Sequence, residues 1–212
     1  MYRLWSADSR GWSTVEADRQ LRLNPAAVAD LQTILAFRLA HTHARPVARL
    51  ANLSGPLGIH AEYTRDEILV GLGHWSLDNR PDFREGVLHL AGSKVDAFFV
   101  TLQKTEKEYS PTTMYEDYAI SPLLFHWQSQ SLTSAQSPTG QRYIHHRDRG
   151  YTPLLFVRET KRLPCGLAAP YSYLGPCEYV SHEGSKPMSV TWKLAHPIPA
   201  RLLRTVERQS VG

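Results

Sequence analysis

Residues 109–142 combine aromatic rings with uncharged hydrogen-bonding side chains and carry few charges. The segment reads YSPTTMYEDYAISPLLFHWQSQSLTSAQSPTGQR. Aromatic faces stack on nucleic-acid bases, and Gln and Ser side chains provide donors and acceptors that read base edges or phosphates. We therefore expect this segment to form a recognition pocket for a base. The expected lining is Tyr115, Trp127, Gln128, Ser129 and Gln130.

A purely structural interpretation of the same segment is also open. If residues 124–130 form a regular strand, alternate side chains face a core, and Trp127 packs inside the protein. In such a strand Gln128 and Gln130 lie on the face opposite Trp127. Only a bulge or a strand end would let all three side chains converge on a base.

A second pattern that could carry chemistry is Glu159-Thr160-Lys161, which follows an apolar segment expected to be a strand. An acidic residue and a lysine at this spacing form half of a metal-dependent nuclease site. Such a site needs another carboxylate to hold Mg²⁺, and Asp96 is the candidate on an earlier strand. The alternative is an exposed ion pair between Glu159 and Lys161.

Other catalytic patterns are missing from the sequence. His145 and His146 are adjacent, and adjacent side chains on a strand point to opposite faces, so the two rings cannot easily share one metal ion. No phosphate-binding glycine loop, G-x-S-x-G turn, C-x-x-C pair or H-E-x-x-H helix occurs. We expect no catalytic residue, metal or cofactor in this chain, and an ATPase, a serine hydrolase and a zinc enzyme are disfavoured.

Positive charge is concentrated in the last third of the chain. Residues 1–140 hold 13 Lys and Arg against 15 Asp and Glu, whereas residues 141–212 hold 11 against 5. This asymmetry favours an anionic partner, although a solvated basic face is the simpler alternative. We expect Arg142, Arg147, Arg158 and Lys161 to contact nucleic-acid phosphates.

The composition is that of an ordinary folded protein. A chain of 212 residues with 42% apolar residues buries enough surface to fold without a disulfide or a metal. The two cysteines, Cys165 and Cys177, are expected to be free thiols in a reducing compartment. No apolar run is long enough to span a membrane and no signal peptide is recognisable, so we expect a soluble cytoplasmic protein.

Two helices precede a region of short strands. Asn24-Pro25 marks a helix start, and apolar residues at helical spacing then predict a core-facing helix that runs to about His41. Thr64 and Glu67 predict a capping box for a second helix, which ends near Gly71 and Gly73. Between these helices, residues 53–59 are expected to be an irregular connector.

From residue 86 onward, short apolar runs between turn residues predict strands. The expected strands are 87–90, 97–102, 124–128, 142–145, 154–158, 171–174, 178–180 and 189–194. Helices before a set of strands indicate an α+β protein, with a helical subdomain packed on a mostly antiparallel barrel or sandwich. We divide the chain into a helical linker or subdomain (1–60), a β-rich domain (61–206) and a tail (207–212).

Several segments resemble the uncharacterised domain that ends many bacterial superfamily-two DEAD/DEAH-box helicases, often in proteins with a phospholipase-D-like nuclease domain. The segments are YTRDEIL (63–69), REGV (84–87), FFVTLQKTEKEYSPTTMYEDYAISPLLFHWQSQS (98–131), SPTGQRYI (137–144), LLFVRE (154–159) and YLGPCEYVSHEGSKPMSVTWKL (173–194). They occur in the family's order and span about residues 55–203. The chain has no helicase motor motif. The resemblance implies an accessory module that positions a helicase on DNA or RNA, in a restriction or phage-defence setting, with helicase and nuclease domains as partners.

The last segments also resemble, more loosely, the closing strands of base-flipping reader barrels of the SRA and PUA-like kind. The residues concerned are Tyr173-Leu174-Gly175, Tyr179-Val180, Glu183-Gly184, Trp192 and Leu194. This resemblance implies a pocket for an extruded or modified base. We therefore expect a non-enzymatic DNA-binding module, on duplex or single strands. The alternatives are a Mg²⁺-dependent nuclease that uses Asp96, Glu159 and Lys161, and a protein-interaction module that docks helicase to nuclease.

Overall fold

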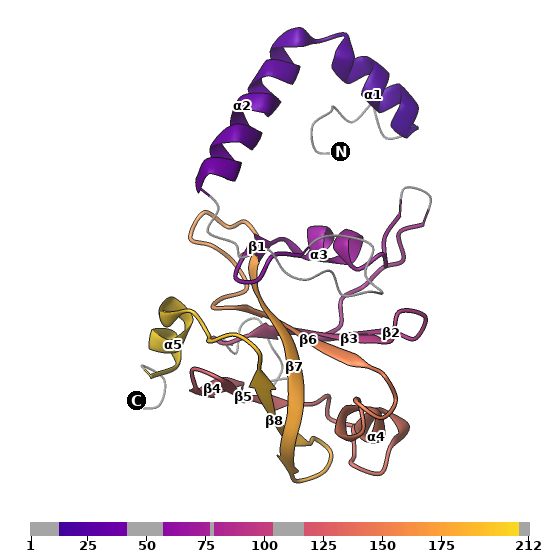
Figure 1. Ribbon diagram of the computed structural model, residues 1–212, viewed down its shortest axis with the longest axis vertical. Helices are drawn as coiled ribbons and strands as arrows, with labels where there is room; N and C mark the ends of the chain where they lie inside the picture. Colours follow the sequence, from indigo (N-terminus) through magenta and orange to yellow (C-terminus); the bar gives the residue numbers. More distant parts are fainter. Residues whose placement is uncertain (1–12, 42–56, 77–78, 104–116, 208–212) are drawn as a thin grey trace. The chain divides into compact units, whose positions relative to one another are not determined.

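The structure of the chain is a computed structural model that describes residues 13–41, 57–76, 79–103 and 117–207. The chain divides into two compact units, Met1–His43 and Ala44–Gly212. The first unit contains α1 (Thr14–Arg22) and α2 (Pro25–His41). The described elements of the second unit are β1 (Glu62–Tyr63), α3 (Arg65–Gly71), β2 (Val87–Leu90), β3 (Val95–Thr101), β4 (Tyr118–Ser121), β5 (Leu124–Gln128), α4 (Pro138–Ile144), β6 (Thr152–Arg158), β7 (Tyr171–Glu183), β8 (Ser189–Leu194) and α5 (Ala200–Glu207) (Figure 1).

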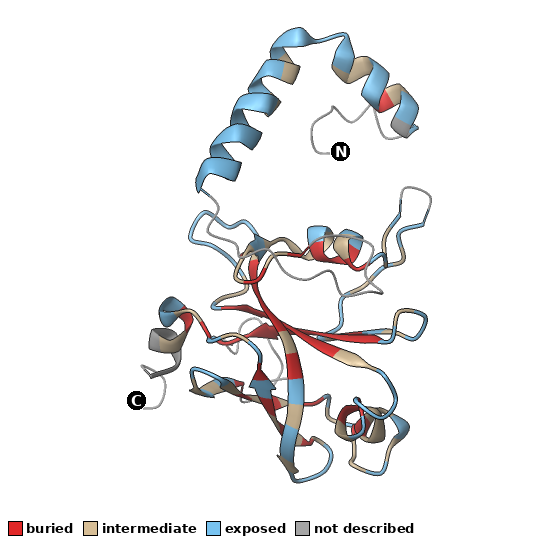
Figure 2. Cartoon of the chain, in the orientation of Figure 1, coloured by how far each residue is buried: buried red, intermediate tan, exposed pale blue. Residues whose placement is uncertain are grey.

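The start and end of α2 follow the sequence signals, but its burial does not. Asn24 Oδ1 accepts a hydrogen bond from the Ala27 N–H at 3.1 Å, and Pro25 is the first helical residue. The expectation that this helix faces a core is wrong, because none of its residues is buried in the described structure (Figure 2). Its apolar residues include neighbours such as Ile34 and Leu35, so they spread around the helix and do not form one stripe.

The predicted capping box of α3 is confirmed. The Thr64 hydroxyl accepts a hydrogen bond from the Glu67 N–H, and the Glu67 carboxylate accepts one from the Thr64 N–H at 2.6 Å. Ile68 and Leu69 then lie on the buried face of the helix. Part of the connector expected before α3, up to residue 56, lies outside the described residues.

All strands join one sheet in the order β2-β3-β6-β7-β8-β5-β4, with β1 alongside the start of β7. Among the described strands, every pairing is antiparallel except that of β3 with β6. The long strand β7 pairs with β6 through its first half and with β8 through its second half (Figure 1). The α+β class with a mostly antiparallel sheet is therefore confirmed.

The expected barrel is wrong. A barrel closes only when its edge strands pair with each other, and the edge strands β2 and β4 do not pair within the described part of the chain. The two halves of the sheet instead face each other across a core. Phe98 of β3 stacks on Trp127 of β5 with their ring centroids 4.4 Å apart, and Trp192 of β8 packs in the same cluster.

The strand β3 separates this core from a second one. Successive side chains of a strand point to opposite faces, so Phe98 joins the cluster between the sheet halves, and Phe99 joins a cluster with Ile68 and Leu69 of α3. All seven residues of β3 are buried as a result. The helix α3 therefore covers the face of the sheet that carries Phe99.

Two strand assignments differ from the sequence prediction. Residues 142–145 were expected to be a strand, but residues 138–144 form α4, because Ser137 caps the helix through its hydroxyl and Pro138 suits the first turn. The separate strands expected at 171–174 and 178–180 are one strand, β7. Its register with β6 shifts between Leu155 and Phe156, which accommodates Gly175 and Pro176 within a continuous strand.

Two further expectations concern membranes and thiols. No described helix combines the length and the apolar character that crossing a membrane requires. Cys165 and Cys177 are both free thiols, as expected, and Cys177 is buried. Burial raises the pKa of the Cys177 thiol well above its ordinary value, so this group is a neutral core residue.

Candidate anion-binding site

The ends of four elements meet on the face of the sheet that α3 covers. In-register parallel pairing places Thr101, the last residue of β3, beside Arg158, the last residue of β6. The strand β7 begins at Tyr171, which pairs with Tyr63 of β1. Arg65 follows β1 as the first residue of α3. Residues far apart in the sequence therefore surround one hollow.

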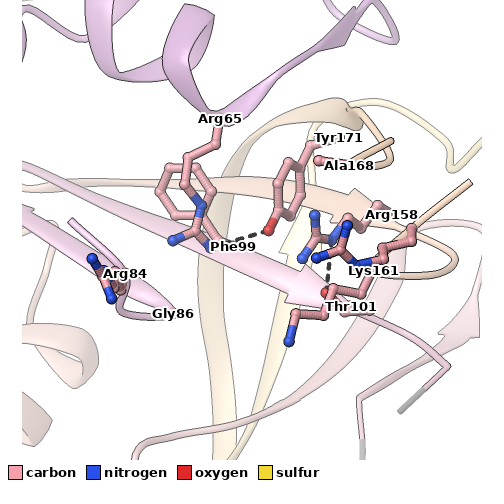
Figure 3. A pocket seen from close by; sticks show the side chains of 10 residues that line it. Arg65, Arg84, Gly86, Phe99, Thr101, Arg158, Lys161, Ala168 and Tyr171 are labelled. Carbon is pink, nitrogen blue, oxygen red and sulfur yellow. Dashed lines mark hydrogen bonds between the residues drawn. The ribbon is translucent and has the colours of Figure 1, made fainter. Parts of the chain in front are cut away.

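This hollow is a cavity of about 450 Å³ with a strongly basic lining. The lining residues are Arg65, Arg84, Gly86, Phe99, Thr101, Arg158, Lys161, Arg162, Ala168 and Tyr171 (Figure 3). Within the part of the chain that the structure describes, this lining includes five cationic side chains and no carboxylate. We call these residues the basic pocket.

Arg158 is the most deeply buried cation of the basic pocket, with 9% of its surface exposed. Its Nε donates to the Thr101 hydroxyl at 2.9 Å, and its Nη1 donates to the Ala169 carbonyl at 3.3 Å. Its guanidinium carbon lies 4.4 Å from the centroid of the Tyr171 ring. No carboxylate pairs with Arg158 among the described residues. A buried charge without a counter-ion is costly, so this arrangement favours a bound anion.

Arg65 lies on the other side of Tyr171 in Figure 3. Its Nη2 donates to the Tyr171 hydroxyl at 3.2 Å, and its guanidinium carbon lies 5.2 Å from the centroid of Phe99. Cation–π contacts and hydrogen bonds of this kind hold a guanidinium in place without neutralising its charge. The wall that Phe99 and Tyr171 form therefore orients two arginines toward the cavity.

The remaining cations lie nearer to solvent. Lys161 and Arg162 belong to the loop between β6 and β7, where Arg162 Nη1 donates to the Gly166 carbonyl at 2.8 Å. Arg84 lies 3.1 Å from the Asp82 carboxylate, and both side chains are exposed. Because an exposed pair is screened by water, Arg84 remains available to a ligand at the rim.

The structure brings together two of the expected phosphate contacts, Arg158 and Lys161, but not the other two. Arg142 Nε donates to Asp96 at 2.8 Å, and Arg147 forms an ion pair with Glu178. Neither Arg142 nor Arg147 lines the basic pocket. The charge of Arg142 is compensated by a buried carboxylate, whereas Arg147 is exposed and lies outside the cavity, so both are weaker candidates for a bound anion than Arg158.

Trp127 occupies the core, as the structural interpretation of its segment predicted. Only 4% of its surface is exposed, and its ring packs against Phe98, Tyr143 and Trp192. A base cannot stack on a face that other rings already cover. In this structure Trp127 therefore stabilises the fold and offers no platform for a base.

The other residues expected beside Trp127 have different surroundings. Ser129 is buried, and its hydroxyl accepts a hydrogen bond from the Met188 N–H at 2.9 Å, which fixes the chain beyond β5. Gln128 ends β5 and is half-buried, whereas Gln130 is exposed. Tyr115 lies outside the described residues. A recognition pocket in this segment stays a prediction.

The nuclease constellation is not assembled. Asp96 pairs with Pro153 near the start of β6, whereas Glu159 and Lys161 follow the end of that strand. With a rise of about 3.3 Å per residue, six residues separate these groups by roughly 20 Å. No group of three metal-binding side chains occurs among the described residues. A single metal ion therefore cannot use Asp96 and Glu159 together.

Asp96 has a structural role instead. It is fully buried, and its carboxylate accepts hydrogen bonds from Arg142 at 2.8 Å and from His89 Nδ1 at 2.9 Å. These bonds join β2, β3 and α4. The ion pair satisfies a carboxylate that would otherwise be buried at high cost.

His146 is also structural. Its Nε2 accepts a hydrogen bond from the Tyr179 N–H at 3.1 Å, so Nδ1 carries the proton and donates to the Tyr151 carbonyl at 3.1 Å. Burial lowers the pKa of His146 below its ordinary value of 6.5. His145 is exposed and caps the C-terminus of α4. The two rings point to different surroundings, so they do not form a metal site.

The aromatic residues behind the loose resemblance to base-flipping barrels are also packed inside. Tyr173 stacks on Phe156 with ring centroids 4.7 Å apart, and Trp192 is fully buried. Gly175 has φ +96°, and a Cβ there would lie 2.6 Å from Ile59 Cδ1. This glycine is therefore required by backbone conformation and close packing, which explains it without a bound base.

Sequence reasoning missed Arg65, Arg84 and Arg162. Arg65 begins a helix, Arg84 lies in a loop and Arg162 follows Lys161, and nothing in the local pattern joins the three arginines to one another. The parallel pairing of β3 with β6 and the pairing of β1 with β7 bring them around one cavity. A parallel pair among short strands is not visible in hydrophobic periodicity alone.

The fold and the basic pocket define an α+β domain with a candidate site for an anionic ligand. The family model described as "Domain of unknown function (DUF3427)" matches residues 57–206. The chain belongs to the DUF3427 family. The matched region begins just before β1 and ends in α5, so it contains every residue of the basic pocket. A comparison with curated proteins found no match.

Proposed function

We propose that this chain is a nucleic-acid-binding module that holds a phosphate group in the basic pocket. The observation that carries the proposal is Arg158, a nearly buried guanidinium that lines a cavity and has no carboxylate partner among the described residues. Arginine binds phosphate through two parallel hydrogen bonds, which makes it the side chain best suited to such a site. DNA is the favoured polymer, in duplex or single-stranded form.

The surroundings of Arg158 support a phosphate over other anions. Arg65 and Arg162 have no carboxylate partner among the described residues, and they line the same cavity. Several guanidinium groups around one hollow match an anion with several oxygens and more than one point of attachment. A single carboxylate would leave much of this charge without a partner.

The proposed biological setting is an accessory role beside a helicase or a nuclease. It rests on the resemblance of residues 55–203 to the domain that ends DEAD/DEAH-box helicases. A module that binds the phosphate backbone would keep the helicase on the nucleic acid without sequence specificity. Reading of a modified base is not part of the proposal, since Trp127 and Trp192 are buried.

Fluorescence anisotropy with a labelled DNA oligonucleotide tests the proposal. We expect wild-type protein to bind at low salt and Arg158→Gln to bind about tenfold or more weakly, because a hydrogen bond to a charged group contributes roughly 1.5–3 kcal/mol. Arg65→Gln is a second variant in the same pocket. The matched control is Arg149→Gln, which removes an exposed arginine outside the basic pocket.

The controls separate binding from folding. Each variant is first compared with wild type by thermal melting, and only variants with a cooperative transition are scored. An equal loss of affinity in Arg149→Gln and Arg158→Gln would contradict a specific site. Absence of any nucleic-acid binding by the wild type would leave the protein-docking alternative in its place.

A further inference from the structure

The basic pocket has features of a site for the end of a nucleic-acid strand. This inference deepens the proposed function and rests on it. Its cations lie at different depths: Arg158 is buried, Arg65 is half-buried, and Arg162 is exposed at the rim. A ligand that satisfies all three must extend into the cavity. It cannot only lie across the opening.

An internal phosphodiester fits this depth poorly. It carries one negative charge and is esterified on both sides, so two sugars flank it and keep it near the protein surface. A terminal phosphate is a monoester, with a charge of about −1.5 to −2 at pH 7 and three strong acceptor oxygens. It can enter the cavity while the rest of the strand remains outside.

Hydrogen-bonding capacity points the same way. Arg158 uses Nε for Thr101 and Nη1 for the Ala169 carbonyl, and among the described residues its Nη2 has no acceptor. Arg65 donates to Tyr171 and to the Phe83 carbonyl. These bonds fix two guanidinium groups and leave donor capacity on the cavity side, where Figure 3 shows both arginines beside Tyr171.

We propose that the basic pocket binds the terminal phosphate of a nucleic-acid strand, a phosphomonoester, in preference to an internal phosphodiester. The site would place Arg158 and Arg65 on the monoester oxygens and Arg162 near the adjoining nucleotide. It would recognise a strand end without regard to base identity.

The test uses the full chain and single-stranded oligonucleotides of one sequence with a 5′-phosphate, a 3′-phosphate or hydroxyls at both ends. An internal label avoids blocking either end, and affinity is measured by fluorescence anisotropy at fixed salt. We expect one phosphorylated end to bind at least tenfold more tightly than the hydroxyl ends. The preference should fall to less than threefold in Arg158→Lys, which keeps the charge and loses the planar fork. Arg65→Lys, at the other guanidinium placed on the monoester, is the second variant if Arg158→Lys does not fold, and it should also reduce the preference.

Two competitors distinguish the possible sources of a phosphomonoester. A nucleoside monophosphate and a phosphoserine peptide are each titrated against the phosphorylated oligonucleotide. We expect both to compete at least a hundredfold less well than the oligonucleotide, because only a strand brings additional backbone phosphates to the rim. Tighter binding of either competitor would overturn the assignment to a strand end.

The failure of this inference differs from the failure of the proposed function. Equal affinity for phosphorylated and hydroxyl ends, with binding still lost in Arg158→Gln, would overturn strand-end recognition and leave phosphate-backbone binding intact. No binding to any oligonucleotide would overturn both proposals. Arg149→Gln should retain the full end preference of the wild type.

Discussion

Thr101 and Arg158 are register partners at the ends of two parallel strands, and the Thr101 hydroxyl accepts a hydrogen bond from Arg158 Nε at 2.9 Å. The bond joins two side chains that are both nearly buried. It fixes the guanidinium of Arg158 at the wall of the cavity. The position of the candidate anion site therefore follows from the parallel pairing of β3 with β6.

Thr101→Val should weaken DNA binding about three- to tenfold and destabilise the protein by about 1–3 kcal/mol. Valine keeps the shape of threonine but removes the acceptor, and a buried donor left without an acceptor costs about this much. Thr101 is a positioning residue in this account. Its control is Thr191→Val on β8, outside the basic pocket. An affinity equal to that of the wild type would show that Arg158 does not need this bond.

Trp127→Ala should destabilise the protein by about 3–5 kcal/mol, because it removes a large buried ring from the core. Thermal melting measures the loss.

The double variant Gln128→Ala/Gln130→Ala should bind DNA like the wild type and melt within a few degrees of it. Weaker DNA binding by the folded double variant would show that residues 124–130 contribute to recognition and would contradict this prediction.

The sequence predicted best those elements whose signals are local. The capping box of Thr64 and Glu67 and the strands 87–90, 124–128 and 189–194 were expected with the bounds that the structure has. The helix α4 was missed although Ser137-Pro138 is a helix-start signal, because residues 142–145 alone read as a strand. Local sequence signals predict where helices and strands begin, but they do not predict which strands pair.

The candidate site was predicted only in part for the same reason. Arg158 and Lys161 stood out because Arg158 ends an apolar strand, Lys161 follows it, and both lie in a basic part of the chain. Arg65 could not be connected with them, since its place beside Tyr171 depends on the pairing of β1 with β7. Trp127 was instead predicted for the site and lies in the core. An aromatic ring can stack on a base, but the ring of Trp127 is buried.

Removal of Asp96 should cost more stability than removal of its more exposed partner, His89. Asp96→Ala leaves Arg142 without its buried counter-ion, and breaking such a pair costs about 3–5 kcal/mol. His89→Ala, which removes the more exposed partner, should cost less than about 1 kcal/mol. Urea unfolding of both variants measures the difference. Equal losses would show that the Asp96–Arg142 pair contributes little.

The stability of the protein should fall as the pH falls below 6.5, partly through His146. Burial keeps the pKa of His146 in the folded protein below that value, whereas the unfolded chain binds a proton at about pH 6.5. The unfolded state therefore binds more protons between the two pKa values, and stability is lost as the pH falls through this window. One proton gives a slope of at most about 1.4 kcal/mol per pH unit.

The variant His146→Gln isolates this effect from the other histidines. It should be less stable than the wild type at pH 7.5, and its stability should change less between pH 7.5 and pH 5.5. Chemical unfolding at several pH values gives both curves. Parallel curves would show that His146 does not titrate differently in the folded and unfolded states.

The salt dependence of DNA binding is the most direct measure of whether the basic pocket holds phosphate. Each phosphate contact contributes a slope of about −0.9 to a plot of log affinity against log salt on duplex DNA. Arg158→Gln/Arg162→Gln removes two pocket cations, and Arg147→Gln/Arg149→Gln removes two exposed cations outside the pocket. We predict that the slope becomes shallower by about 1 to 2 in the pocket variant and by less than about 0.5 in the other variant. Unchanged slope and affinity in the folded pocket variant would contradict the proposed function.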